Sequence, residues 1–260
     1  MSSRAVRPPA PPATGSAPTG SSPVVAITGA SGALGRALLR RWHGQGARLI
    51  ALTSSDTPLE IRDAQGEPLP LRQVCWATGQ EEALAPLLAE VDILVLNHGV
   101  NVHQQRDAVA VERSLEINAL SAWRLMELFA RVVQQRPADG RPRPELWVNT
   151  SEAEILPAVS PLYEISKRLM GQLLSLRALD LAADLRIRRL VLGPFRSALN
   201  PIGVMTADWV AGEVLRQAGW NWGLIVVTPN PLTWVLMPLA SLGRWLYFRA
   251  LSRPAAAGAP

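Results

Sequence analysis

The stretch Val24-Val25-Ala26-Ile27-Thr28-Gly29-Ala30-Ser31-Gly32-Ala33-Leu34-Gly35 decides the fold class of this 260-residue chain. Its apolar start predicts a buried strand, and a helical pattern follows the glycines as far as about Gln45. Gly29 permits a tight turn, and Gly35 permits close packing of the helix against the strand. The N-terminus of such a helix presents free N–H groups and the positive end of its dipole. The turn is therefore suited to the pyrophosphate of a dinucleotide.

Further apolar runs predict a series of strands that alternate with helices. The expected strands are 48–53, 74–76, 91–96, one starting at 146–148, 185–192 and 224–227. The expected helices cover 81–89, 111–135 and the segment that contains Tyr163. This alternation predicts a doubly wound α/β domain, a parallel sheet (Rossmann fold) with helices on both faces.

Composition divides the chain into three parts. Residues 1–22 are a Pro/Ala/Ser-rich tail without an apolar run, so we expect them to be disordered and not to form a signal peptide. Residues 23–230 are expected to form a dinucleotide-binding catalytic domain. Residues 231–260 are expected to form an apolar C-terminal helix and tail.

The net charge of +5 comes almost wholly from arginine. The arginines are scattered and few tyrosines or phenylalanines accompany them, so we expect no nucleic-acid partner. An anionic cofactor and an anionic lipid surface explain the charge equally well. The single cysteine, Cys75, excludes an internal disulfide and a cysteine-based metal site. We expect no metal and a cytoplasmic, reducing location.

The only lysine, Lys167, lies four residues after Tyr163, one of two tyrosines. This spacing places both side chains on one face of a helix. A phenol has an ordinary pKa of about 10, and a nearby cation lowers that pKa by stabilising the phenolate. The pair is therefore predicted to perform acid-base chemistry.

The second predicted strand ends in Thr53-Ser54-Ser55, and the chain has no Asp or Glu before Asp56. An NAD-binding domain usually places a carboxylate here to bind the ribose 2′-hydroxyl. Arg36, Arg40 and Arg41 follow the glycine turn. This pattern favours NADP(H) over NAD(H), with the alternative that at least two of the arginines only face solvent.

These residues together resemble the short-chain dehydrogenase/reductase family over about residues 24–227. Its Thr-Gly-x-x-x-Gly-x-Gly turn is matched by Thr28, Gly29 and Gly35, with Ala33 in place of the middle glycine. Its Tyr-x-x-Ser-Lys motif is matched in full by Tyr163, Ser166 and Lys167.

The resemblance also implies the site residues. The implied catalytic residues are Asn118, Ser151, Tyr163 and Lys167. The implied cofactor-binding residues are Thr28, Gly29, Ser31, Gly32, Leu34, Gly35, Asn97, Gly99, Lys167 and Pro194. Thr150 is an alternative to Ser151, because the family serine lies about thirteen residues before the tyrosine and Ser151 lies twelve before it. His98 is expected to be structural.

The resemblance implies an oxidoreductase that transfers a hydride between NADP(H) and a hydroxyl or carbonyl group, with Tyr163 as general acid and base. The alternative is a non-catalytic nucleotide-binding sensor or scaffold. A homo-oligomer is expected, as in many family members. A narrower resemblance is to the dehydrogenase part of bifunctional sterol desaturase/short-chain dehydrogenase proteins. We expect no desaturase part, because three histidines cannot form its di-iron site.

The C-terminal stretch has no charged residue from Gln217 to Gly243 and is rich in Trp and Leu. Prolines and Arg244 interrupt it, so we expect it not to cross a bilayer. Residues 232–250 fit a peripheral helix at the inner face of a membrane, or equally a substrate lid or dimer contact. All these alternatives favour a lipophilic substrate.

Overall fold

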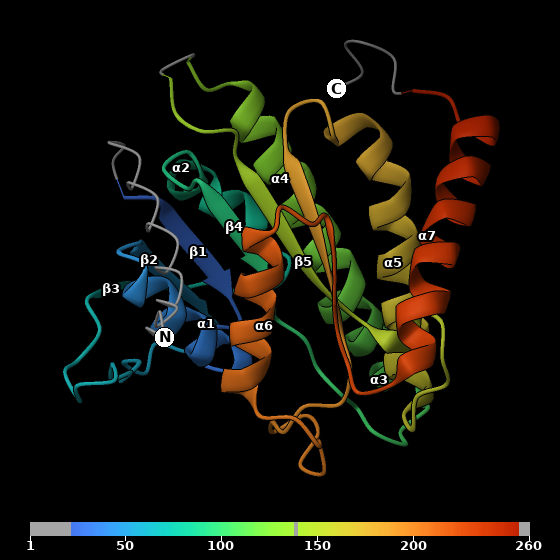
Figure 1. The fold of residues 1–260 in the computed structure, drawn as a ribbon, viewed down its shortest axis with the longest axis horizontal. Coiled ribbons are helices and arrows are strands. Elements are labelled where there is room, and N and C mark those ends of the chain that lie inside the picture. The colour runs from blue at the N-terminus through green and yellow to red at the C-terminus, as the bar shows by residue number, and fades with distance from the viewer. Residues whose placement is uncertain (1–21, 138–139, 255–260) are drawn as a thin grey trace, which may run out of the picture.

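The structure, a computed structural model, describes residues 22–137 and 140–254. Its seven strands form one parallel sheet in the order β3-β2-β1-β4-β5-β6-β7 (Figure 1). The strands are β1 (Val24–Thr28), β2 (Arg48–Thr53), β3 (Leu71–Cys75), β4 (Ile93–Leu96), β5 (Glu145–Ser151), β6 (Arg186–Leu192) and β7 (Leu224–Val227). The predicted doubly wound sheet is confirmed. The predicted disordered tail, apart from Ser22, lies outside the described residues.

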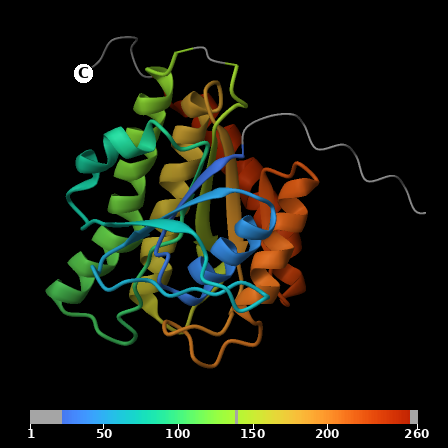
Figure 2. The same cartoon turned by 90° about the vertical axis from the view of Figure 1, so that its left-hand side faces the viewer.

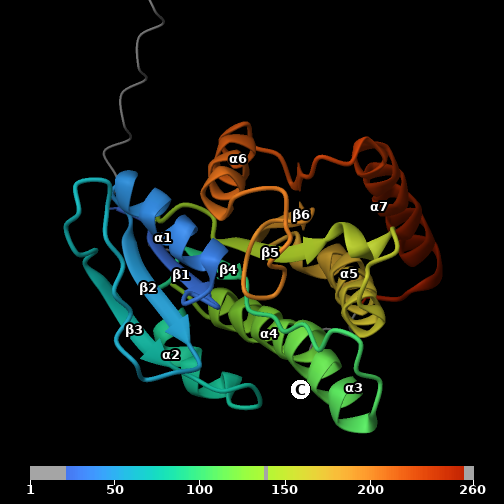
Figure 3. The same ribbon diagram turned by 90° about the horizontal axis from the view of Figure 1, so that it is seen from below.

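Helices cover both faces of the sheet, with α4 on one side and α6 on the other (Figure 2). The longer helices are α1 (Ala33–Gly44), α3 (Ala108–Leu115), α4 (Ser121–Gln134), α5 (Pro161–Leu181), α6 (Ala207–Gly219) and α7 (Pro231–Leu251). The short ones are η1 (Glu81–Leu84), α2 (Ala85–Leu88), η2 (Glu116–Leu120) and η3 (Glu152–Glu154). Helix α7 lies beside α5 at the β7 edge of the sheet (Figure 3).

The central strands β1 and β4 are buried on both faces, which explains their continuous apolar runs. Val25 and Ile27 of β1 belong to a core shared with α1 and α6. Val24 and Ala26 face the other way, into a core shared with α4 and α5. The alternation of side chains along a strand therefore divides the interior into two layers.

Strands β1, β4, β5 and β6 all run in one direction, so their carboxyl ends meet at one edge of the sheet. The strand order reverses between β1 and β4, because the chain proceeds outward from β1 to β2 and β3 and then returns. Parallel sheets bind ligands in the crevice at such a reversal point. The predicted site residues follow these strand ends.

Two predicted elements differ in detail. The helix expected over 111–135 is α3 and α4 joined by one turn of π-helix, η2. The C-terminal stretch, expected to be interrupted by its prolines, is one helix that continues through Pro238. Proline removes one helical hydrogen bond, and the contacts of Met237 and Arg244 on either side hold this helix against the domain.

Candidate active site at the carboxyl ends of the strands

The glycine turn between β1 and α1 is shaped by two close approaches. Gly29 has a φ of +60°, and a Cβ at this position would lie 2.8 Å from the His98 Cα. A Cβ on Gly35 would lie 2.4 Å from the Gly29 carbonyl oxygen. Gly29 is required because its backbone conformation is one that other residues rarely adopt. At both positions a larger side chain would also collide with neighbouring backbone atoms.

Within the described residues, no side chain caps the N-terminus of α1, and its first turn holds no acidic residue. Helices α3, α6 and α7 are instead capped by Asp107, Thr206 and Asn230. The first N–H groups of α1 are thus left for another acceptor, and a phosphate fits that position. Ser31 and Gly32 are exposed at this turn.

Not every residue predicted to bind the cofactor presents its side chain there. Leu34 is buried in the core, so its backbone alone is placed to contact a ligand. The fully buried Thr28 accepts hydrogen bonds from the backbone N–H groups of Asn97 (2.8 Å) and His98 (3.2 Å). Thr28 therefore links the glycine turn to the end of β4 and acts as a support.

Asn97 connects three strand ends. Its Nδ2 donates to the Gly29 carbonyl at 3.4 Å, and its Oδ1 accepts from Asn149 Nδ2 at 2.9 Å.

His98 is hydrogen-bonded to Thr28 through Nδ1 at 2.8 Å, and its ring contacts the Trp76 ring edge-on. Burial lowers the pKa of His98 to about 4, with a smaller effect of Lys167. His98 is thus neutral near pH 7, as expected for a structural residue.

The three arginines after the glycine turn have different partners. Arg36 donates to the carbonyl oxygens of Ser31 (2.9 Å) and Glu60 (2.8 Å), beside the turn. Arg40 forms an ion pair with Asp208 at 2.6 Å, and Arg41 donates to the Asp208 carbonyl at 3.2 Å. Arg40 and Arg41 therefore hold α6 against α1, and Arg36 alone lies where a 2′-phosphate could be met.

The structure brings Ser151, Tyr163 and Lys167 together. Ser151 ends β5, and its side chain lies close enough to the phenol of Tyr163 on α5 to affect the pKa of that phenol. Its Oγ donates to the Leu192 carbonyl at 3.4 Å and accepts from the Ala153 N–H at 3.2 Å. Lys167, one turn further along α5, donates from Nζ to the Asn149 carbonyl at 3.1 Å. Its Nζ lies 5.7 Å from the centre of the Tyr163 ring. Thr150 faces away and donates to the Leu190 carbonyl at 3.2 Å, so Ser151 is the hydroxyl beside Tyr163.

Burial dominates the titration of this cluster. It raises the pKa of Tyr163, and the smaller, opposite effect comes from the hydrogen bond with Ser151. Burial also lowers the pKa of Lys167 to about 8, with Glu154 acting in the opposite direction. The expectation that Lys167 lowers the pKa of Tyr163 is therefore wrong for this structure. Desolvation of the phenol is the largest effect on its pKa.

Asn118 is buried within the π-turn η2 and holds the loop after β4. Its Oδ1 accepts from the Val100 N–H at 2.7 Å, and its Nδ2 donates to the Val100 carbonyl at 2.9 Å. The same Nδ2 donates to Ser166 Oγ at 3.0 Å, which joins this loop to the Tyr163 helix. A Cβ on Gly99 would lie 3.1 Å from Asn118 Oδ1. A π-turn re-aims one side chain within a helix, and such turns are common at functional sites.

Two glutamates after Ser151 anchor α7, a role that the sequence pattern did not reveal. Glu152 accepts from Thr228 at 2.7 Å and from Thr233 at 3.1 Å. The Glu154 side chain is fully buried and pairs with Arg189 (3.3 Å) and Arg244 (2.5 Å). A Cβ on Gly171 of α5 would lie 2.0 Å from Glu154 Oε2, so that glycine provides space for the carboxylate. The only hint in the sequence was two acidic residues beside a catalytic-type serine.

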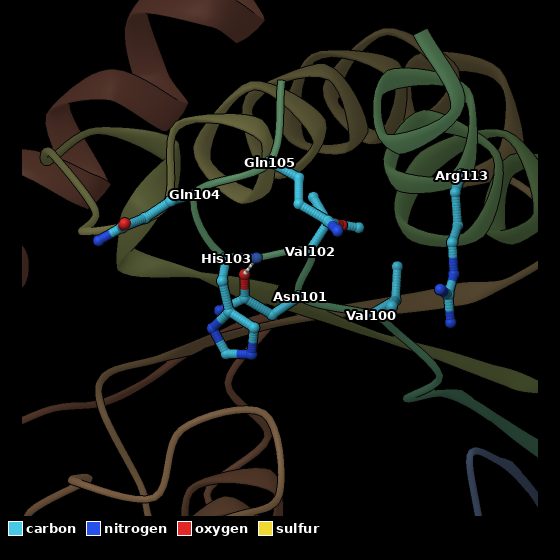
Figure 4. Close-up of a pocket in the computed structure, with 7 residues that line it drawn as sticks. All are labelled: Val100, Asn101, Val102, His103, Gln104, Gln105 and Arg113. Atoms are coloured by element: carbon cyan, nitrogen blue, oxygen red, sulfur yellow. Dashed lines mark hydrogen bonds between the residues drawn. The ribbon is translucent and has the colours of Figure 1, made fainter. Parts of the chain in front are cut away.

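A pocket of about 500 Å³ lies along the loop after β4 (Figure 4). Its lining residues are Val100, Asn101, Val102, His103, Gln104, Gln105 and Arg113. Among the described residues, this lining includes none of the four predicted catalytic residues. The pocket is therefore separate from the cluster of Ser151, Tyr163 and Lys167. Asn101 Nδ2 donates to the Leu199 carbonyl at 3.4 Å, and the Pro194 carbonyl accepts from the Val204 N–H at 3.0 Å. The segment after β6 is thereby folded toward the pocket.

Substitution of Gly29 by Ala is expected to destabilise the protein and to abolish binding at the glycine turn. Gly46 is a matched control, since it has a φ of +77° but no atom within 4 Å of a built Cβ. Gly46→Ala should cost about 1 kcal/mol from backbone strain alone. Thermal unfolding and NADPH titration of both variants test this. Equal behaviour of the two variants would show that the approach to His98 does not matter.

Comparison with known proteins agrees with this geometry. The sequence profile of the short chain dehydrogenase family matches residues 23–199. The monoglucosyldiacylglycerol epimerase of Synechocystis sp. is 47% identical over 229 residues, which are 88% of this chain and 55% of that protein. This chain thus spans about half the length of that relative.

Two solved structures share the fold. A short chain dehydrogenase from Burkholderia cenocepacia, in complex with NADP, superposes with a TM-score of 0.71 at 17% identity and covers 89% of this chain and 98% of its own. A short-chain dehydrogenase from Sphingobium yanoikuyae, in complex with NADPH, gives 0.68 at 18% identity, with 91% and 98% covered. The chain belongs to the short-chain dehydrogenase family of NAD(P)-dependent oxidoreductases.

Proposed function

We propose that this protein catalyses hydride transfer between NADP(H) and a hydroxyl or carbonyl group of a lipophilic substrate. The main support for this proposal is the cluster of Ser151, Tyr163 and Lys167, together with the uncapped N-terminus of α1 at the glycine turn. NADP(H), when bound, supplies or accepts the hydride. A sensor or scaffold of the same fold would need the glycine turn but not this cluster.

Tyr163 is the group that moves the proton. Because burial raises its pKa, the phenol is protonated near pH 7 and is suited to donate to a carbonyl oxygen during reduction. In the opposite direction, the phenolate takes the proton of the substrate hydroxyl. Ser151 Oγ lies against the phenol and would hold the same substrate oxygen.

Lys167 and Asn118 position these groups. Lys167 brings a buried ammonium to within 5.7 Å of the phenol ring and would hydrogen-bond the ribose of the cofactor. Asn118 fixes the loop after β4 through both polar groups of the Val100 backbone. Its double hydrogen bond keeps Gly99 close to the site.

The substrate side favours an apolar molecule. Leu199, Ile202 and Val204 are exposed on the segment after β6, near Asn101 of the pocket lining. Apolar side chains gathered at the edge of a site favour a lipophilic ligand.

A second candidate is epimerisation of a sugar hydroxyl in a glycolipid, which the 47% identity to an epimerase of that class favours. Oxidation would convert the secondary alcohol to a ketone, with its proton passing to Tyr163 and its hydride to the cofactor. Return of the hydride to the opposite face of the ketone carbon, and of the proton to the ketone oxygen, would invert that carbon. The cofactor would end in its starting state, so no net oxidation occurs.

NADPH is expected to bind about tenfold or more tightly than NADH, because one charged hydrogen bond to the 2′-phosphate contributes roughly 1.5–3 kcal/mol. Titration is followed by energy transfer from the nine tryptophans to the nicotinamide. Arg36→Gln should remove the preference. Arg41→Gln is the control, because Arg41 binds the Asp208 carbonyl. An unchanged preference in Arg36→Gln would exclude Arg36 as the phosphate ligand.

Incubation with a glucosyl diacylglycerol tests turnover and separates the two reactions. A dehydrogenase forms NADPH in proportion to a keto product. An epimerase needs only catalytic NADP⁺ and returns an altered sugar without net NADPH. Cofactor binding without either product, extended to other lipid alcohols and ketones, would leave the sensor as the better description.

A further inference from the structure

We propose that α7 docks the protein on an anionic lipid bilayer, with its outer face buried in the membrane interface. Three residues on the inner face of α7 hold the helix against the domain. Thr233 bonds Glu152, Met237 packs against Val191 and Val226, and Arg244 pairs with Glu154. These contacts fix which face of the helix is turned outward, and Figure 3 shows α7 at the outside of the molecule beside α5.

The outer face of α7 is apolar along its length. Its exposed side chains recur at helical spacing and are 39% to 60% exposed: Leu232, Val235, Leu236, Leu239, Leu242 and Leu246. Within the described helix, the charged residues are Arg244, which faces inward, and Arg249, which lies in the last turn. A surface helix normally places polar residues outward, so this face is built to be covered.

The flanks of this face specify what covers it. Trp245 and Tyr247 are exposed beside it, and the Arg249 guanidinium lies 5.3 Å from the centre of the Trp245 ring. Arg253 follows, and the chain has no Asp or Glu after Glu213. Aromatic rings and arginines flanking a leucine face suit the boundary between lipid headgroups and acyl chains. An anionic headgroup would supply the negative charge that this part of the chain lacks.

A second copy of α7 fits less well. It would cover the leucines, but it carries no carboxylate to meet Arg249 or Arg253 of the first copy. No helix among the described residues is long and apolar enough to cross a membrane. The helix would therefore lie along the bilayer surface.

Docking would place the membrane next to the site. The anchors of α7 are Glu152 and Glu154, one and three residues after Ser151. A lipid substrate could then reach Tyr163 while its acyl chains stay in the bilayer. This consequence rests on the proposed function, whereas the docking itself does not.

Co-sedimentation of the full chain with vesicles tests the proposal. The wild type should pellet with vesicles of phosphatidylcholine and phosphatidylglycerol, less with phosphatidylcholine alone, and less as salt is raised. The double variant Leu239→Asp/Leu246→Asp should partition at least about tenfold more weakly, since two leucines that the bilayer would cover become charges. Val109→Asp, an exposed apolar position on α3, is the matched control and should pellet like the wild type.

Three results would overturn the proposal. The first is wild-type protein that stays in the supernatant, and the second is a double variant that pellets like the wild type. The third is a change in oligomeric state of the double variant by light scattering, which would identify the face as a contact between copies. NADPH titration and thermal unfolding of each variant check folding. Loss of vesicle binding with intact NADPH binding separates this proposal from the proposed function.

Discussion

Tyr163→Phe is expected to lower turnover by about 10²- to 10⁴-fold while NADPH binding stays at the wild-type level. The substitution removes one hydroxyl, the proton donor and acceptor of the proposed reaction, and a positioned acid-base group contributes a factor of this size. The ring remains, so its packing beside Lys167 is preserved. Steady-state rates and tryptophan energy transfer measure the two quantities separately.

The control for this variant is Tyr247→Phe, which alters the only other tyrosine, exposed on α7. Its turnover of a water-soluble substrate should equal that of the wild type. The pH profile adds a further readout. Because the pKa of Tyr163 is raised, the rate of alcohol oxidation should rise with pH as phenolate forms, while carbonyl reduction should not. Wild-type turnover in Tyr163→Phe would remove Tyr163 from the mechanism.

Glu154→Gln is expected to destabilise the protein by about 3–5 kcal/mol, because it leaves two largely buried arginines without their carboxylate. Arg189 and Arg244 both contact Glu154 Oε2, and they belong to β6 and α7. Removal of the charge is therefore expected to weaken the contact of Glu154 with β6 and the attachment of α7 to the domain. Urea unfolding measures the change in free energy.

Glu82→Gln serves as the matched control, since Glu82 and its partner Arg131 are both largely exposed. Exposed pairs contribute about 0–1 kcal/mol, so this variant should unfold almost like the wild type. A double-mutant cycle with Arg244→Gln should show strong coupling to Glu154. Additive effects of the two substitutions would mean that the ion pair does not hold α7.

Loss of the Glu154 carboxylate also has a readout at the site. Glu154 is the charge that raises the pKa of Lys167 against the effect of burial. In Glu154→Gln the pKa of Lys167 should fall further below about 8. The limb of the pH profile that depends on the ammonium should therefore shift to lower pH.

The fold could be predicted because it depends on local patterns. Apolar runs such as Ile93–Leu96 must be buried on both faces, and the glycines of the β1 turn leave few alternatives for the backbone. The Tyr163–Lys167 pair was also predictable, since helical spacing alone places both side chains on one face. The π-turn at Asn118 was not, because no local pattern distinguishes it from an ordinary helix.

The sequence by itself determined the parallel sheet, the position of the glycine turn and the identity of the residues that cluster around Tyr163. Only the tertiary structure decided that Ser151 and not Thr150 faces the phenol, and that Arg36 alone remains beside the turn. It also decided that Glu152 and Glu154 hold α7. The physical reason is distance along the chain. Strand register, burial and ion pairing join residues tens of positions apart, and these contacts set both the pKa of Tyr163 and the outward face of α7.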